Sequence, residues 1–409
     1  MSNCVNKKDF KIVKDGITYP IGIKAAGVKS GIRFNRKDLA MIYSEKIADG
    51  CGVFTKNKFK AAPLKVTGQN LSASQGKLQA VLINSGIANA CTGEKGLIDA
   101  WDSVKEVAKQ LKVKEEYVAV TSTGKIGEFL PMQKIKTGIQ KAILELSIKG
   151  GTEAAEAILT TDTKKKEVAV NFKINGHEVR IGGMAKGSGM IHPNMATMLG
   201  FITSDISIKV DLLQEALKNV IENTFNMISV DRDTSTNDMV LLMANGLAGN
   251  KTISEKNADY KIFLDALYYT AEYLAKCMAK DGEGATKLIE VEVQNALTKN
   301  DAKKIAKSVV TSPLVKTAVF GNDPNWGRIL AAVGYSGAEV DTEKIDLYLK
   351  EKIVENGEPL KCSRLELHKY LEESDEIKIV INLKLGKEDA TAWGCDLTYD
   401  YVKINTKYS

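Results

Sequence analysis

Short runs of β-forming residues alternate with amphipathic helical segments along most of this chain of 409 residues. The run at 78–84 is apolar and rich in β-formers, which indicates a buried strand. Apolar residues then recur at helical spacing from Leu97 to Leu111. The pattern repeats with a strand at 117–121 and a helix that begins at Pro131. The chain must therefore build sheets covered by helices, and its fold class is mixed α and β.

Antiparallel pairing is predicted at two Asn-Gly dipeptides. Residues 168–174 alternate between apolar and polar, Asn175-Gly176 follows, and the alternation resumes at 179–181. Asn-Gly tolerates the positive φ angles of a type I′ turn, so this pattern predicts a hairpin. A second such turn is expected at Asn356-Gly357, and residues 377–385 alternate as a half-buried strand does.

Two further helices are expected in the second half of the chain. Asp211 can cap one that carries apolar residues from Leu212 to Ile221, and another is expected from about Tyr260 to Met278. The length exceeds the usual single-domain range, which predicts two structural units or one large two-layered unit.

The charge of the chain does not favour a nucleic-acid partner. The net charge of +6 comes from 57 basic and 51 acidic residues, and 44% of the chain is hydrophobic. The longest basic block, Lys164-Lys165-Lys166, is followed at once by Glu167, and we interpret it as a solvated turn.

The cysteine pattern indicates an intracellular protein. The six cysteines form no C-x-x-C pair and none lies near a histidine at zinc spacing, so no metal site is expected. Dispersed cysteines are typical of reduced, mostly buried thiols. The chain has no apolar N-terminal stretch like a signal peptide and no apolar run of 18 residues, so we expect a cytoplasmic protein that does not span a membrane.

Residues 182–200 are the most unusual segment, with five glycines and one proline in 19 residues. Composition alone favours a flexible surface loop. The alternative is self-cleavage between Ala196 and Thr197, in which the threonine hydroxyl attacks the preceding carbonyl and the resulting ester is hydrolysed. The freed α-amine of Thr197, with a pKa of about 7.7–8.0, could then act as the base for its own hydroxyl.

The scarcity of histidine makes such a self-activated nucleophile attractive. The chain holds three histidines, His177, His192 and His368. His177 is next to a predicted turn and His368 lies in a charged helical stretch, so both are expected at the surface. His192 is interpreted as structural rather than as a catalytic base.

Nine segments in order resemble the ornithine acetyltransferase family of arginine biosynthesis, also called the bifunctional glutamate N-acetyltransferase family. They cover nearly the whole chain: GIKAAGVKSGI (22–32), CGVFTKNKFKAAPLKV (51–66), NSGIANACTG (84–93), TSTGKIGEFLP (121–131), TTDT (160–163), KGSGMIHPNMATML (186–199), SVDRDTSTND (229–238), DGEGATK (281–287) and SPLVKTAVFGNDPNWGRI (312–329).

The resemblance implies a protein that cuts itself into an α chain, 1–196, and a β chain, 197–409, which stay together as an α2β2 heterotetramer. The implied fold is similar to that of self-processing aminopeptidases, with stacked β-layers flanked by helices. Thr197 would carry acetyl from N-acetylornithine to glutamate by ping-pong transfer, without a cofactor. Some members also use acetyl-CoA as donor, and the sequence leaves that alternative open.

The resemblance also implies roles for individual residues. Thr123 and Gly124 match the family's oxyanion-stabilising pair, and Lys186 and Glu283 match its substrate-binding lysine and glutamate. The remaining substrate contacts implied are Thr160, or Thr161 next to it, together with Thr197, Asn405 and Ser409. Taken without the family, the threonines could simply end a helix, and Lys186 and Glu283 could be solvent-exposed.

Three departures from the family pattern are visible. Ile87 stands where the family usually has Asn, and Lys125 stands where an apolar residue is common. The C-terminus is one residue shorter than the common pattern, which affects the role of Ser409 more than that of Asn405. An N-terminal-nucleophile aminopeptidase or amidase of the same fold is the competing hypothesis, and a non-enzymatic binding protein is the third.

Overall fold

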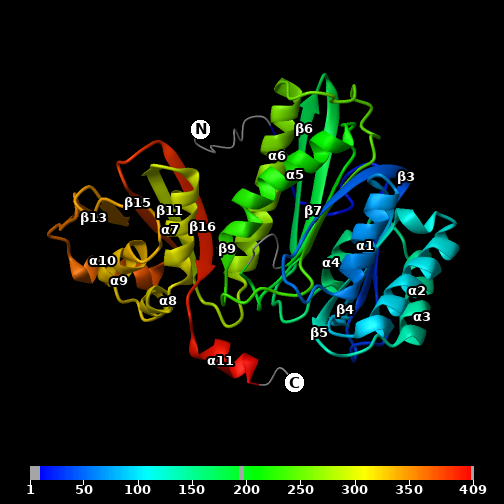
Figure 1. The fold of residues 1–409 in the computed structure, drawn as a ribbon, viewed down its shortest axis with the longest axis horizontal. Helices are drawn as coiled ribbons and strands as arrows, with labels where there is room; N and C mark the ends of the chain where they lie inside the picture. The colour runs from blue at the N-terminus through cyan, green and yellow to red at the C-terminus, as the bar shows by residue number, and fades with distance from the viewer. Residues whose placement is uncertain (1–9, 193–197, 407–409) are drawn as a thin grey trace.

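Two mixed β-sheets form the framework of the computed structural model, which describes residues 10–192 and 198–406 (Figure 1). Within those residues, the larger sheet has nine strands in the order β1-β6-β7-β8-β10-β3-β4-β5, with β2 paired to β3. Its strands are β1 (Phe10–Val13), β2 (Ile23–Val28), β3 (Leu39–Phe54), β4 (Lys77–Ile87), β5 (Val118–Lys125), β6 (Lys166–Ile174), β7 (His177–Lys186), β8 (Leu199–Ser204) and β10 (Met239–Ala244).

The long strand β3 folds this sheet into two facing layers. Its first half pairs with β2 and β4 and its second half pairs with β10, with an irregular register between Tyr43 and Ala48. Side chains alternate along each strand, so Ala40 and Ile42 point to one core while Leu39 and Met41 point to another. Ala40 and Ile42 share a core with residues of β8 and β10, which places the two β-layers face to face.

Helices cover the outer face of each layer. The helix α1 (Ala62–Ala73) packs on β3 and β5, α2 (Gly93–Leu111) on β4 and β5, and α3 (Met132–Leu144) on β2 and β3, whereas α5 (Val210–Asn223) packs on β3 and α6 (Ala258–Lys280) on β6 and β7. The short helix α4 (Gly151–Ala157) contributes Ala154 and Ala155 to the core between the layers. The predictions of a mixed α and β class and of stacked β-layers flanked by helices are confirmed.

The second sheet forms a separate lobe, to the left in Figure 1. Its described strands run in the order β14-β13-β12-β15-β11-β16-β9. They are β9 (Ile228–Ser229), β11 (Leu288–Ala296), β12 (Asp346–Leu349), β13 (Glu351–Glu355), β14 (Glu358–Pro359), β15 (Glu376–Asn382) and β16 (Glu388–Cys395), accompanied by helices α7 (Lys299–Thr311), α8 (Pro313–Phe320), α9 (Trp326–Gly334) and α10 (Arg364–Glu373). The last helix, α11 (Tyr399–Asn405), leaves this lobe and runs back beneath the first (Figure 1).

The predicted cleavage bond falls between two neighbouring strands of the larger sheet. Strands β7 and β8 are antiparallel, with Lys186 opposite Leu199, and β8 and β10 lie between β7 and β3. The predicted α and β chains would therefore share one sheet and one core. The boundary between them does not coincide with the boundary between the lobes. Ala196 and Thr197 lie outside the described residues, and so does Ser409.

Both predicted hairpins are confirmed. Asn175 and Gly176 have φ angles of 49° and 83° between β6 and β7, and Asn356 and Gly357 have φ angles of 49° and 79° between β13 and β14. The strand expected at 377–385 ends earlier, at Asn382, because Lys384 adopts a left-handed φ of 53° that breaks the extended backbone.

Three expectations were wrong. Asp211 is not the cap of its helix, since α5 begins at Val210 after Lys209, and Asp211 lies in the first turn instead. Residues 182–188 are not a surface loop but the buried end of β7 and its continuation. Of the basic triplet, Lys164 and Lys165 are exposed as expected, whereas Lys166 is buried.

Two properties of the described residues bear on the earlier expectations about thiols and membranes. Five cysteines are free: Cys51 and Cys395 are buried, Cys277 and Cys362 partly buried, and Cys91 exposed. None of the described helices combines the length and the apolar character needed to cross a membrane.

Candidate functional site

A cavity of about 140 Å³ lies where the end of β5, the end of β7 and the start of β10 meet. Seven residues predicted from the sequence line it: Thr123, Gly124, Thr160, Thr161, Lys186, Glu283 and Asn405. Ile191 and Met198, close to either side of the predicted cleavage bond, line it as well. Segments that are far apart in the chain thus converge on one small space.

At one position near the end of β5, no residue other than glycine fits. Gly124 has a φ of 131° and lies opposite Gly86 of the parallel strand β4. A Cβ atom on Gly124 would lie 2.2 Å from the carbonyl carbon of Gly86, far inside contact distance. The preceding residue, Thr123, is buried at the cavity wall. The strand pair therefore brings Thr123 and the backbone of Gly124 to the cavity without an intervening side chain.

Lys186 is the last residue of β7, and its ammonium group lies in the wall of the cavity. Its Nζ donates to Thr160 Oγ1 at 2.7 Å and to Thr123 Oγ1 at 3.3 Å. Burial lowers the pKa of Lys186, and the charge of Asp162 opposes this most strongly. The contact distinguishes Thr160 from Thr161, which lines the same cavity. Neither threonine ends the preceding helix, because α4 stops at Ala157.

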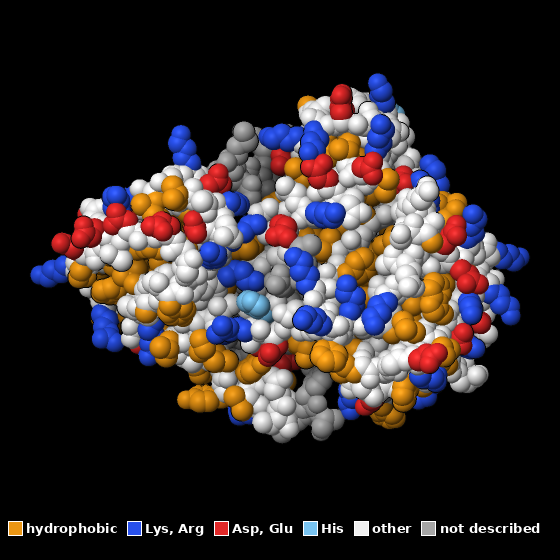
Figure 2. Space-filling model, in the orientation of Figure 1, with side chains coloured by type: hydrophobic (Ala, Val, Ile, Leu, Met, Phe, Trp, Pro, Cys, Tyr) orange, Lys and Arg blue, Asp and Glu red, His pale blue; other side chains and the backbone are white. Residues whose placement is uncertain are grey.

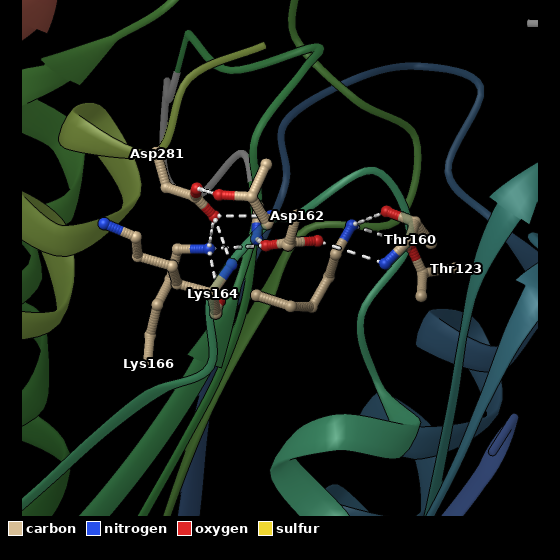
Figure 3. Close-up of polar contacts among 9 residues, drawn as sticks. Thr123, Thr160, Asp162, Lys164, Lys166 and Asp281 are labelled. Atoms are coloured by element: carbon tan, nitrogen blue, oxygen red, sulfur yellow. Dashed lines mark hydrogen bonds and ion pairs between the residues drawn. The ribbon is translucent and has the colours of Figure 1, made fainter. Parts of the chain in front are cut away.

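Asp162 connects this wall to a buried ion pair that sequence analysis missed (Figure 3). Its Oδ1 accepts from Lys166 Nζ and from the backbone N of Gly187, each at 2.7 Å, and its Oδ2 accepts from Thr160 N at 3.1 Å. Burial raises the pKa of Asp162, but the charges of Lys186 and Lys166 outweigh that effect and hold the pKa well below its usual range. A single carboxylate therefore fixes the segments that carry Thr160 and Lys186.

Asp281 completes this network from the end of α6. Its Oδ2 lies 2.5 Å from Lys166 Nζ, and its Oδ1 accepts from Thr163 Oγ1 (Figure 3). Lys166 is thus a buried cation between two carboxylates, which explains why the basic triplet is not a solvated turn throughout. The Asp four residues before Lys166 in TTDTKKK was the available signal, since a Lys at the start of a buried strand requires a partner.

Glu283 approaches the cavity from the turn between α6 and β11. Its backbone N donates to Ser188 O at 2.9 Å, and its Oε2 accepts from Asn405 Nδ2 at 2.8 Å. Asn405 is exposed on α11, which is held nearby because Thr398 Oγ1 donates to Gly284 O at 2.7 Å. A Cβ atom on Gly189 would lie 2.4 Å from the Glu283 carboxyl carbon, so the glycine provides the room for this carboxylate.

Two residues of the SVDRDTSTND segment also contribute to the wall. Asn237 Nδ2 donates to Ala88 O at 2.6 Å and to Ser122 O at 2.8 Å, which ties the start of β10 to the end of β5. Asp238 is buried at the cavity, and burial raises its pKa well above the ordinary value against hydrogen bonds from Ser235 and Thr55. Neither residue had been singled out from the sequence.

The histidines and the two departures from the family pattern lie elsewhere. His177 and His368 are exposed, as expected, and His192 is partly buried with Nδ1 3.0 Å from Ser229 Oγ. Ile87 pairs in register with Lys125, whose ammonium lies 3.8 Å from Glu128. Within residues 10–192 and 198–406, no group of three or more His, Cys, Asp or Glu side chains is arranged to hold a metal ion.

The chain closely resembles known proteins over nearly its full length. A model of the ArgJ family matches residues 24–409. The arginine biosynthesis bifunctional protein ArgJ of Caldanaerobacter subterraneus is 53% identical over 404 residues, which are 98% of this chain and 100% of the relative. The protein of the same name from Bacillus subtilis is 51% identical over 397 residues, which are 97% of each chain.

Two solved structures also match the chain. A crystal structure of the ArgJ protein from Bacillus halodurans is 51% identical, covers 51% of this chain and 99% of its own, and has a TM-score of 0.50. An ornithine acetyltransferase from Mycobacterium tuberculosis, complexed with ornithine, is 40% identical, covers 46% of this chain and 100% of its own, and has a TM-score of 0.42. The chain therefore belongs to the ArgJ family of bifunctional arginine-biosynthesis enzymes.

Proposed function

We propose that this protein is a self-processing acetyltransferase that moves an acetyl group from N-acetylornithine to glutamate. One observation carries the proposal: the cavity between Ile191 and Met198 holds the ammonium of Lys186, the carboxylate of Glu283 and the strand end at Thr123 and Gly124. A small amino acid with both charges is the substrate class that such a cavity suits. Family membership and the ornithine-bound relative support the same assignment.

The proposed processing step cleaves the bond between Ala196 and Thr197. The hydroxyl oxygen of Thr197 attacks the Ala196 carbonyl, the C–N bond breaks, and the chain is linked through an ester. Water then hydrolyses the ester, which leaves a carboxylate on Ala196 and a free amine on Thr197. The larger sheet supports this proposal, because β7 and β8 pair across the cut and would hold both products together.

In the first half-reaction Thr197 takes the acetyl group. Its α-amine accepts the hydroxyl proton while the oxygen attacks the acetamide carbonyl of N-acetylornithine. The developing oxyanion needs preorganised donors, and Thr123 Oγ1 with the backbone N of Gly124 are proposed to supply them. The C–N bond breaks, the proton passes to the leaving nitrogen, and ornithine departs.

In the second half-reaction the amine of glutamate attacks the acetyl ester. The bond to the Thr197 oxygen breaks, that oxygen recovers a proton, and N-acetylglutamate leaves. Lys186 is proposed to pair with a substrate carboxylate, and Glu283, held by Asn405, with a substrate amine. N-acetylornithine and glutamate share an α-carboxylate, so Lys186 can serve both halves of the cycle, whereas Glu283 can pair with the side-chain amine of the ornithine half.

The remaining assignments follow from the family and are part of the proposal. The two chains would assemble as an α2β2 heterotetramer in the cytoplasm and would need no cofactor. Thr160, Thr161 and Ser409 are proposed as further substrate contacts. Acetyl-CoA is a candidate second donor, as the word bifunctional in the relatives' names allows.

The decisive experiment combines a denaturing gel with an acetyl-transfer assay. Purified protein should give two fragments near half of 44.5 kDa, and Thr197→Ala should stay uncut and inactive. A single uncut band that still transfers acetyl would overturn the Thr197 mechanism.

An aminopeptidase or amidase of the same fold would also cut itself. Ornithine release from N-acetylornithine that accelerates when glutamate is added distinguishes transfer from hydrolysis.

A further inference from the structure

A second, larger hollow of about 620 Å³ opens next to the cavity, and its lining is strongly cationic. Among the described residues that line it, Arg232, Lys303, Lys304 and Lys307 face a single carboxylate, Glu222. Figure 2 shows Lys and Arg side chains gathered in the middle of the face seen there, where the two lobes meet. We call this hollow the cationic groove.

The groove and the cavity share a thin wall made of two short segments. Ile191 lines the cavity and His192 lines the groove; likewise Ser235 lines the cavity and Thr234 the groove. The segments pair with each other through a β-bridge between Ile191 and Thr234, and Thr234 Oγ1 donates to His192 O at 2.8 Å. A ligand in the groove would therefore lie one layer of backbone away from the cavity.

Two lysines of the groove lie on the same helix face and are partly buried. Lys303 and Lys307 lie one turn apart on α7, so their side chains share a face of that helix. Burial lowers the pKa of Lys307 to about 8, and burial also lowers the pKa of Lys303. Glu222 Oε2 lies 3.9 Å from Lys303 Nζ, at the limit of an ion pair. The described lining of the groove thus carries four cationic side chains and one carboxylate.

We propose that the cationic groove binds a phosphorylated small molecule with at least two negative charges. A phosphate ester carries about 1.5 to 2 charges and several acceptor oxygens, which suits clustered lysines better than a single carboxylate does. Ser308 and Thr311 also line the groove, and its volume lies in the ordinary range for ligand sites of about 300–1,000 Å³.

Two sources of such a ligand differ in what reaches the cavity. One is an acyl donor whose phosphorylated part lies in the groove while its acyl thioester extends past the shared wall into the cavity. This first source rests on the proposed function. The other is a phosphorylated metabolite that binds without reacting. The anion site itself rests on the groove alone, so it can be tested whether or not acetyl transfer occurs.

The test is calorimetric titration of the full-length processed protein with sodium tripolyphosphate. We expect saturable binding that is weakened roughly a hundredfold in Lys304→Gln/Lys307→Gln, because each lost charge-assisted contact contributes about one order of magnitude. Lys303→Gln should weaken binding in the same direction. Lys261→Gln, an exposed lysine on α6 away from the groove, is the matched control and should bind as the parent protein does. Thermal unfolding and the cleavage gel establish that each variant is folded.

The competing sources are separated by coenzyme A and acetyl-CoA. If the double variant loses acetyl-CoA-dependent N-acetylglutamate formation but keeps the reaction from N-acetylornithine, the ligand is an acyl donor. If coenzyme A does not compete with tripolyphosphate, the ligand is a separate metabolite. The inference is overturned by absence of tripolyphosphate binding, by binding that the groove variants do not weaken, or by preferential binding of a DNA duplex. Failure of acetyl transfer from N-acetylornithine in the parent protein would instead count against the proposed function.

Discussion

Asp162 Oδ1 lies 2.7 Å from Lys166 Nζ, and this buried ion pair lies directly behind the cavity wall that carries Lys186. The same oxygen accepts from the backbone of Gly187, the residue after Lys186. The position of the predicted substrate lysine is therefore coupled to a carboxylate that is not itself one of the described residues lining the cavity.

Asp162→Asn should destabilise the protein by about 3 kcal/mol, the lower end of the usual cost of breaking a buried ion pair, because Lys166 keeps its contact with Asp281. Two buried cations, Lys166 and Lys186, lose a nearby negative charge in this variant. The free energy of unfolding in urea measures the effect. Glu215→Gln, which breaks an exposed ion pair with Lys256, is the control and should change stability by no more than about 1 kcal/mol. An equal effect of both substitutions would contradict the role given to Asp162.

Gly189→Ala should impair substrate binding while leaving the fold intact. The new methyl group would meet the end of the Glu283 side chain, which can move away, rather than backbone. We expect the KM for N-acetylornithine to rise about tenfold, equivalent to ~1.4 kcal/mol of lost binding. Gly68→Ala in α1 is the control, because nothing lies within 4 Å of its added Cβ atom and KM should not change. An unaltered KM in Gly189→Ala would show that Glu283 need not hold its present position.

Asn405→Ala should lower kcat/KM about five- to tenfold, because a hydrogen bond from an exposed side chain contributes roughly 1–1.5 kcal/mol. The lost contact is the 2.8 Å hydrogen bond from Asn405 Nδ2 to Glu283 Oε2. Lys403→Ala on the same exposed helix, whose ammonium pairs with Asp400, is the matched control.

A double-mutant cycle can also test whether Asn405 and Glu283 act together on kcat/KM. If Asn405 acts through Glu283, the effects of Asn405→Ala and Glu283→Gln should not add in the double variant. Strict additivity would mean that Asn405 contributes independently of Glu283.

The sequence predicted the elements that depend on local patterns. Both hairpins follow from Asn-Gly turns, and the stacked layers follow from the family resemblance and from strands whose side chains alternate. The errors arose where distant partners decide the outcome. Lys166 is buried because Asp162 and Asp281 reach it from 4 and 115 residues away, and no local pattern reveals the second of these.

The candidate site shows the same division between motif and geometry. Thr123, Lys186 and Glu283 were predicted from their positions in the family motifs. The structure places all three around one cavity, and their roles remain predictions. Asp162 and Asp238 went unnoticed because an acidic residue within a polar segment is normally exposed. They are buried together with partners such as Lys166 and Gly187 for Asp162 and Thr55 for Asp238. The cationic groove likewise depends on α7 meeting a segment more than 60 residues earlier, at Arg232.

His192 should make the protein less stable as the pH falls from about 6.5 to about 4. Burial, together with the charges of Lys307 and Arg232, lowers the pKa of His192 to about 4 in the folded protein, against about 6.5 when unfolded. Between these values the unfolded chain binds more protons, so stability rises with pH across this window and is lost as the pH decreases. Because the side chain is partly exposed, we expect an effect on the order of 1–2 kcal/mol.

Urea unfolding at several pH values, compared between the parent protein and His192→Gln, measures this contribution. Glutamine keeps a group able to bond Ser229 but cannot take up a proton. The difference in unfolding free energy between the two proteins should therefore change by that amount between pH 7 and pH 4, in favour of the variant at low pH. His177→Gln, at an exposed turn, is the control. A difference that stays constant with pH would rule out His192 as a source of acid sensitivity, and with it the electrostatic link between this residue and the cations of the groove.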